Sequence, residues 1–259
     1  FDGNNKKIIN LYVNRPIFSK DKPEDGGITV GLFGGIMGEM MSPVVIKDLE
    51  LINPNITGAN RVGAIAAAAM FTKFENCKVT GGIVKGTALP LAETNIDNFV
   101  GRTTSTGGML GMVFSKGNGI YNCSSSTTVI GTDAVGGLVG YNYGNEIKDS
   151  FATGNVTGLK FIGGLAGCNI GTAINMGGKY IFITSKIENS YSTGKVRGTD
   201  DNSNETGVGG LVGYNHVFAE IINSYSTGKV EGKQNTGGLV GHNNLGTVEN
   251  SFATGDVNG

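Results

Sequence analysis

Short apolar runs alternate with segments rich in Gly, Asn, Ser and Thr along the whole chain. No run repeats its apolar positions with a helical period over the ten or more residues that a helix needs. In residues 150–156 the alternation has a period of two, so an inward Val156 would place Phe151 and Thr153 outward. The pattern predicts short strands with one buried face. A β-bulge would reverse this parity, so the direction of the aromatic residues stays open.

The same block of sequence recurs along the chain. The best copies read VGGLVGYN from Val135 and from Val208, and TGGLVGHN from Thr236. An interrupted copy starts at Ile162, and three degenerate copies start at Val30, Val62 and Thr106. Without its insertions the period is roughly 27 to 32 residues, which is typical of stacked solenoid coils.

One such repeat cannot bury its apolar edge alone, whereas coils stacked about 4.8 Å apart form a continuous core and parallel ladders. We therefore predict an all-β chain that forms a right-handed parallel β-helix, or β-solenoid, of about seven coils with loop insertions. Recurrent Asn and Gly suit ladders and positive-φ corners. The predicted repeat core consists of Leu138, Leu165, Leu211, Leu239, Val156, Val196, Val230 and Val257.

We expect residues 1–259 to form a single β-helical repeat domain. Residues 1–29 would be an N-terminal cap or partial coil, 30–131 the degenerate repeats and 132–259 the well-formed ones. Insertions at about 87–105 and 169–185 would project from the rod, and repeat proteins often bind through such loops. The first contains Pro90 and Asp97, and the second contains Tyr180 and Phe182, two candidate ligand-binding residues.

The segments GGLVGYNYGNEIKDSFATGNVTG, GGLVGYNHVFAEIINSYSTGKVEG and GGLVGHNNLGTVENSFATGDVNG resemble the GLUG repeat, named after its Gly-Leu-(any)-Gly core. The opening FDGNNKKIINLYVNRP is similar to a segment that often precedes such arrays. The resemblance implies a β-helical fold, an extracellular or bacterial cell-surface location, and no catalytic residue. Proteins of this kind include adhesin-like proteins and the non-catalytic regions of IgA-specific metallopeptidases. We expect the chain to belong to a larger parent protein with other domains.

Charge and cysteine content remove several function classes. The chain has 20 basic and 21 acidic residues, so it has no excess of positive charge that would attract nucleic acid. The longest apolar run, residues 62–71, falls short of the ~20 residues that cross a bilayer, so we expect no membrane insertion by this segment. Cys77, Cys123 and Cys168 have an odd count and no CxxC spacing, which fits neither a zinc site nor a disulfide framework. We expect each to fill a small slot in the core.

No catalytic residue, cofactor or resident metal is predicted. The two histidines, His216 and His242, follow the Gly-rich core of their repeats, and His242 would join a column with Tyr141 and Tyr214. The best candidates for the paired carboxylates of a glycosidase lie in the polar stretch from Thr199 to Thr206, which is typical of a solvated loop. A calcium site is the alternative there, and its ligands would be Asp200, Asp201 and Glu205.

One column of aromatic residues is the strongest candidate on the coil faces. Aligned aromatics could simply stack and stabilise neighbouring coils, or they could form a strip that binds a carbohydrate or a protein. An accompanying column of Thr153, Thr193, Thr227 and Thr254 supplies one Thr per coil, too few for an ice-binding array. The candidate ligand-binding column consists of Phe151, Tyr191, Tyr225 and Phe252.

The preferred function is a non-catalytic cell-surface adhesin or structural stalk that presents or contacts a glycan or protein of a host or matrix surface. The alternative is a carbohydrate-active enzyme, a polysaccharide lyase or glycosidase with a groove along the β-helix. A glycosidase would need two carboxyl groups about 5 to 10 Å apart in such a groove. The acidic residues are instead scattered from repeat to repeat, which favours the non-catalytic reading.

Overall fold

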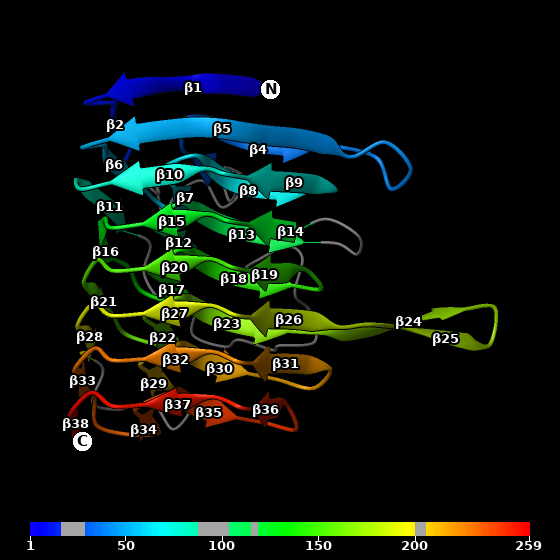
Figure 1. Ribbon diagram of the computed structural model, residues 1–259, viewed down its shortest axis with the longest axis vertical. Coiled ribbons are helices and arrows are strands. Elements are labelled where there is room, and N and C mark those ends of the chain that lie inside the picture. The colour runs from blue at the N-terminus through cyan, green and yellow to red at the C-terminus, as the bar shows by residue number, and fades with distance from the viewer. Residues whose placement is uncertain (17–28, 88–103, 115–118, 200–205) are drawn as a thin grey trace, which may run out of the picture.

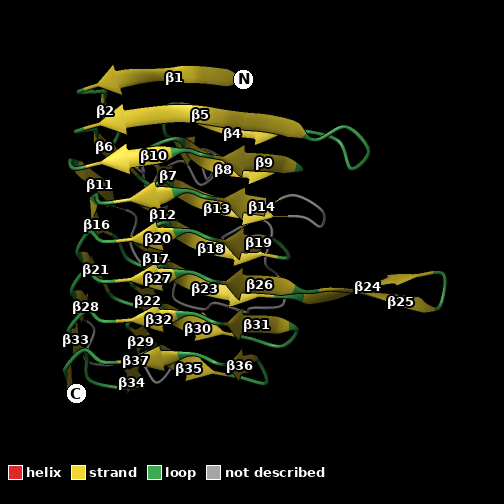
Figure 2. Ribbon diagram, in the orientation of Figure 1, coloured by secondary structure: helices red, strands yellow, loops and turns green. Residues whose placement is uncertain are grey.

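A computed structural model describes residues 1–16, 29–87, 104–114, 119–199 and 206–259. Every regular element in these ranges is a β-strand, and nearly all strand pairs are parallel (Figures 1 and 2). The chain runs leftward along the front of Figure 1, returns rightward along the back, and descends one layer with each turn. The described residues therefore form a right-handed parallel β-helix, as the repeat pattern predicts.

Two sheets line the back of the rod, and each coil contributes one strand to each. Sheet C consists of β3 (Thr29–Val30), β7 (Arg61–Gly63), β12 (Ser105–Gly107), β17 (Val135–Gly136), β22 (Ile162–Gly163), β29 (Val208–Gly209) and β34 (Thr236–Gly237). Sheet D consists of β4 (Phe33–Met37), β8 (Ala66–Met70), β13 (Leu110–Phe114), β18 (Val139–Tyr143), β23 (Ala166–Ile170), β30 (Val212–Asn215) and β35 (Val240–Asn243).

Sheet A forms the front and contains two columns of strands that the long strand β5 (Val44–Ile52) joins. The first column consists of β9 (Thr72–Glu75), β14 (Gly119–Tyr121), β19 (Glu146–Lys148), β26 (Ser185–Glu188), β31 (Ala219–Ile222) and β36 (Thr247–Glu249). The second consists of β10 (Lys78–Thr80), β15 (Ser124–Ser125), β20 (Phe151–Ala152), β27 (Tyr191–Ser192), β32 (Tyr225–Ser226) and β37 (Phe252–Ala253).

Sheet B closes the coil between sheets A and C. It consists of β2 (Tyr12–Asn14), β6 (Asn55–Gly58), β11 (Ile83–Gly86), β16 (Thr128–Ile130), β21 (Val156–Gly158), β28 (Val196–Gly198), β33 (Val230–Glu231) and β38 (Val257–Asn258). At the N-terminus, β1 (Asp2–Ile9) pairs with β5 and β2 pairs with β6. These two strands add a partial coil above the first repeat.

The register of sheet C shows that the sequence repeats are the structural coils. Val30 pairs with Val62, Val62 with Thr106, and Thr106 with Val135. Val135 pairs with Ile162, Ile162 with Val208, and Val208 with Thr236. All seven repeat starts therefore lie in one column, including those separated by insertions.

Burial follows the predicted alternation along each strand. A column of apolar residues runs through the interior of sheet A in register, Phe74, Ile120, Ile147, Ile187 and Ile221, and all are buried. Seven further buried side chains meet where sheets B and C join: Val129, Val135, Val156, Ile162, Val196, Val208 and Val230. A dry core therefore runs along the length of the rod, which is how repeats that cannot bury their own apolar face become stable.

A second set of interior contacts is polar. Asn142 Nδ2 donates to Asn169 Oδ1 at 2.9 Å, and Asn169 Nδ2 donates to Asn215 Oδ1 at 2.9 Å. Asn215 Nδ2 donates in turn to Asn243 Oδ1 at 2.8 Å. This asparagine ladder gives the buried Nδ2 of each coil an acceptor on the next coil, so the recurrence of Asn after the GGLVG core has a direct physical cause.

Two corners of the coil explain other recurrent residues. Between the columns of sheet A, the chain turns through a left-handed residue in each coil, such as Asn189 (φ 49°) and Asn223 (φ 49°), and Asn tolerates this conformation better than most residues. Between sheets C and D, a Cβ on Gly136 would overlap the carbonyl oxygen of Val139. The first Gly of the GGL core is therefore required, because the backbone three residues later leaves no room for a side chain.

Candidate binding surface

The aromatic column forms a stack on the outer face of sheet A. Ring centroids lie 4.9 Å apart for Phe151 and Tyr191, 5.0 Å for Tyr191 and Tyr225, and 5.3 Å for Tyr225 and Phe252. The interplanar angles are 3°, 5° and 7°, so the rings are nearly parallel. Three members are half-buried and Phe252 is exposed, whereas the neighbouring Ser150 and Ala152 are buried. The column therefore faces outward.

The stacking decides what these rings can contact. Tyr191 and Tyr225 each have an aromatic ring against both faces, so they present mainly their edges to solvent. Sugar rings pack on aromatic faces, and the faces of the inner members are already occupied. The geometry thus favours a ladder that ties coils together over an open sugar-binding platform.

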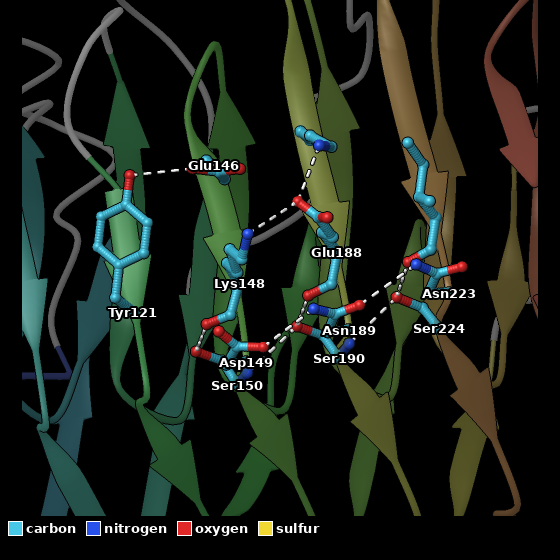
Figure 3. Close-up of polar contacts among 12 residues, drawn as sticks. Tyr121, Glu146, Lys148, Asp149, Ser150, Glu188, Asn189, Ser190, Asn223 and Ser224 are labelled. Atoms are coloured by element: carbon cyan, nitrogen blue, oxygen red, sulfur yellow. Dashed lines mark hydrogen bonds and ion pairs between the residues drawn. The ribbon is translucent and has the colours of Figure 1, made fainter.

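A polar ladder borders the aromatic column (Figure 3). Ser150 N donates to Ser190 Oγ at 3.2 Å, and Ser190 N donates to Ser224 Oγ at 3.2 Å. Beside the serines, Asn189 Nδ2 donates to Asp149 Oδ1 at 3.1 Å and Asn223 Nδ2 donates to Asn189 Oδ1 at 3.4 Å. The serine and asparagine side chains of this ladder hydrogen-bond to neighbouring coils, so the ladder serves to connect coils and does not present these groups to a ligand.

Charged side chains on the first column of sheet A pair both across coils and along a strand. Glu188 lies 2.8 Å from Lys186 on its own strand and 3.4 Å from Lys148 on the neighbouring coil, and these lysines lower the pKa of its carboxyl. The Tyr121 hydroxyl donates to Glu146 at 3.0 Å, and burial together with this bond raises the pKa of Tyr121 to about 12. The sequence reasoning did not single out this strip. In the sequence, this strip is indicated by acidic and basic residues that alternate at equivalent positions of successive repeats.

The insertion at 169–185 forms a two-stranded antiparallel arm, β24 (Thr172–Met176) and β25 (Lys179–Ile183). The arm extends well beyond the rod in Figure 1. Tyr180 is 60% exposed and Phe182 is 55% exposed, and Ile181 between them is also exposed. The Phe182 ring lies 4.9 Å from Phe218, which braces the base of the arm against the neighbouring coil. The arm therefore exposes large apolar side chains to solvent, because the rod does not cover them.

Another exposed apolar group lies at the turn between β4 and β5, where Met37, Met40 and Met41 are all exposed. Sequence reasoning missed this turn because it read residues 30–58 as a plain degenerate repeat. The run Met37-Gly-Glu-Met-Met41 next to Pro43 was the available signal for a turn.

The predicted column of Tyr141, Tyr214 and His242 is present. Tyr141 pairs with Cys168, Cys168 with Tyr214 and Tyr214 with His242 on sheet D, and the His216 ring lies 5.3 Å from that of Tyr214. Both histidines pack against aromatic rings. Across the described residues, no three His, Cys, Asp or Glu side chains lie together as a metal site would require. The calcium candidates Asp200, Asp201 and Glu205, and Pro90 and Asp97 of the first insertion, lie outside the described residues.

Most of the predicted repeat-core residues are fully buried, namely Leu138, Leu165, Leu211, Val156, Val196 and Val230. Val257 is 45% exposed and Leu239 is half-buried. Both lie in the last coil, where strands β34 to β38 end the order of their sheets. Each coil buries its neighbours, so a residue in the end coil keeps part of its surface exposed.

All three cysteines are buried. Cys168 lies on the outer side of sheet D in a cluster with Tyr141, Phe161 and Tyr214. Cys77 and Cys123 lie in the main core, in neighbouring coils. The prediction that each cysteine lies in the core agrees with their burial. The sequence analysis did not predict that Cys77 and Cys123 are adjacent.

Comparison with family models gives one description. The model described as the GLUG motif matches residues 131–157, 204–231 and 232–258. The last two segments contain β29 to β33 and β34 to β38, so each spans one coil of the helix. No curated protein matches the chain. Within the described residues, no helix has the length and apolar character needed to span a bilayer.

Proposed function

We propose that this chain, a GLUG-motif repeat protein, is a non-catalytic spacer and contact segment of a bacterial cell-surface or secreted protein. The β-helix would hold other parts of a larger protein at a distance, and one projecting element would touch a glycan or protein of a host or matrix surface. The extracellular location is part of the proposal and derives from the resemblance to GLUG-repeat surface proteins.

The rod itself supports the spacer role. Its polar ladders, its aromatic stack and the ion pair of Lys148 with Glu188 connect one coil to the next, so the coils stiffen one another along the axis. Repeat proteins built this way behave as continuous rods because each unit is held by both neighbours.

The observation that carries the contact role is the exposure of the arm. Tyr180, Ile181 and Phe182 on β25 are exposed, whereas the rings of the aromatic ladder cover one another's faces. Tyrosine supplies a large amphipathic contact surface at low entropic cost, which is why it is frequent in binding sites. We therefore assign the contact to the arm in preference to the ladder, two groups the sequence left as alternatives.

Electrostatics favours a non-catalytic role over a glycosidase. A general acid in such an enzyme needs a carboxyl group with a raised pKa. The carboxyl pKa values of Asp2, Glu188 and Glu231 are instead lowered by hydrogen bonds and neighbouring lysines. Carboxylates held in this state bind cations and donate no proton near neutral pH.

A binding screen with matched variants tests the proposal. The purified chain is applied to a glycan array and to a panel of matrix proteins, and every hit is measured again with Tyr180→Ser. We expect the variant to weaken specific binding at least about tenfold, the loss that removal of one buried aromatic contact typically causes. The matched control is Tyr191→Ala with Tyr225→Ala, which disrupts the ladder and should leave binding in place.

Two results would contradict the proposal in different ways. Binding that survives Tyr180→Ser but disappears in the folded ladder variant would move the contact to sheet A. Absence of binding to every glycan and protein in the screen would remove the adhesive role and leave the spacer role alone.

A further inference from the structure

Cys77 and Cys123 occupy the same place in two adjacent coils. The parallel pairing of Lys78 with Ser124 places each cysteine next to the other, one residue before the strand begins. They are 1% and 0% exposed. The Cys77 amide donates to Cys123 Sγ at 3.4 Å, so the sulfur of one coil contacts the backbone of the other.

The following coils carry serine at this place, and the serine makes the same contacts. Cys123 N donates to Ser150 Oγ at 3.0 Å, and the column continues through Ser190, Ser224 and Ser251. Each side chain also donates to the carbonyl two residues before it: Cys123 Sγ to Tyr121 O at 3.2 Å, as Ser150 Oγ does to Lys148 O at 2.8 Å. Serine therefore satisfies the structural needs of this column.

A cysteine has a larger and more apolar side chain than serine, and it adds the capacity to form a bond to a second sulfur. Residues directly paired in neighbouring parallel strands have Cα atoms about 4.8 Å apart, within the range of about 4.4 to 6.8 Å that disulfides span. We propose that Cys77 and Cys123 form a disulfide that ties two adjacent coils together.

The reaction needs an oxidant, which we identify by class as a low-molecular-weight disulfide, RSSR. The Cys77 thiolate attacks RSSR, forms a mixed disulfide and releases one RSH after protonation of the leaving thiolate. The Cys123 sulfur then loses its proton and attacks the Cys77 sulfur, which forms the Cys77–Cys123 bond and releases the second RSH. Two thiols are oxidised, and one RSSR is reduced to two RSH.

In the folded coils the two thiols differ in acidity. The neighbouring Cys123 thiol lowers the pKa of the Cys77 thiol, whereas burial raises the pKa of Cys123. The thiolate is the nucleophile in disulfide exchange, and attack by either cysteine first gives the same Cys77–Cys123 bond. Because both sulfurs are buried in the folded coils, we expect the exchange while the coils assemble.

The third cysteine provides an internal control. Cys168 pairs with Tyr141 on one side and Tyr214 on the other, so neither paired neighbour offers a sulfur. Oxidation should leave this thiol free. The serine column provides matched variants, since Cys77→Ser and Cys123→Ser each install the side chain that neighbouring coils already use at this place.

The test is to refold the unfolded, reduced chain in a mixture of reduced and oxidised glutathione. We expect the mass to fall by about 2 Da, one thiol out of three to remain titratable in denaturant, and a Cys77–Cys123 linked peptide after digestion. The bond closes a segment with a sequence separation of 46 residues, so the thermal midpoint should rise by several degrees and fall again when reductant is added.

The variants make the result decisive. Cys77→Ser and Cys123→Ser should keep the wild-type circular dichroism spectrum and show no midpoint change with reductant, whereas Cys168→Ser should behave as the wild type does. Three titratable thiols in a correctly refolded wild type would overturn the proposal. A disulfide that involves Cys168 in the folded protein would overturn it as well.

Discussion

Asn169 lies in the middle of the buried asparagine ladder and is fully buried. Its Nδ2 is the donor to Asn215 Oδ1, so Asn169→Ala would leave that buried oxygen without this donor. We expect a loss of about 1 to 3 kcal/mol in the free energy of unfolding, the usual cost of an unsatisfied buried polar group. Urea denaturation measures it, with Thr193→Ala on the exposed face as the control. A loss equal to that of the control would mean that the ladder does not stabilise the fold.

Glu231 makes the stability of the last coils depend on pH. Lys195 and Lys229 lie 2.7 Å and 3.0 Å from its carboxylate, and their hydrogen bonds lower the pKa to about 2 from its usual value of 4.5. A carboxyl whose pKa is lower in the folded state stabilises the fold above its unfolded pKa, and this contribution disappears as the pH falls toward 2. We expect Glu231→Gln to lower the thermal midpoint at pH 6 but hardly at pH 2.

Thermal unfolding at both pH values in low salt measures this difference. The two lysines are exposed and Glu231 is partly exposed, so the effect should be small and should shrink further in high salt. A gap between wild type and Glu231→Gln that is the same at pH 6 and pH 2 would show that the carboxylate charge does not contribute.

At the scale of the strand, the aromatic ladder makes a graded prediction. Tyr191 stacks on a ring at each side, whereas Phe252 stacks on one. At about 0.5 to 1.5 kcal/mol per aromatic pair, Tyr191→Ala should cost about one pair more than Phe252→Ala. Chemical denaturation of the two variants compares them directly. Equal losses would contradict a stabilising contribution from ring stacking in the column.

The strands also show what the sequence could reveal. The repeat starts, the period-two alternation and the aromatic column are local patterns, and the register of sheets A and C reproduces them. The arm was expected only as a projecting insertion. Its antiparallel pairing depends on the Gly177–Gly178 turn, where both φ angles are positive, and the sequence analysis did not use that turn.

The adjacent cysteines were missed for a different reason. The coils that contain Cys77 and Cys123 differ in length, so the two residues lie at different distances from their repeat starts. Both nevertheless follow an Asn, as Ser190, Ser224 and Ser251 do. Aligning the Asn-Cys and Asn-Ser pairs across repeats would have placed the cysteines in one column.

For the whole molecule, burial depends on neighbours in the stack and not on the repeat sequence alone. Val230 and Val257 pair directly in sheet B and occupy equivalent places, yet only Val230 is buried. Stability should therefore be a property of interfaces between coils, to which core, asparagine ladder and serine column all contribute. Removing one complete coil should leave every one of these columns aligned.

Deletion of residues 208–235 tests this account most directly. The residues run from one repeat start to just before the next, so the coil that begins at Ile162 would stack on the coil that begins at Thr236. We predict a protein that keeps the β-sheet circular dichroism spectrum and a cooperative thermal transition, whereas deletion of residues 208–221, half a coil, abolishes both. Loss of cooperative unfolding in the whole-coil deletion, matching the half-coil deletion, would contradict the stacking of equivalent coils.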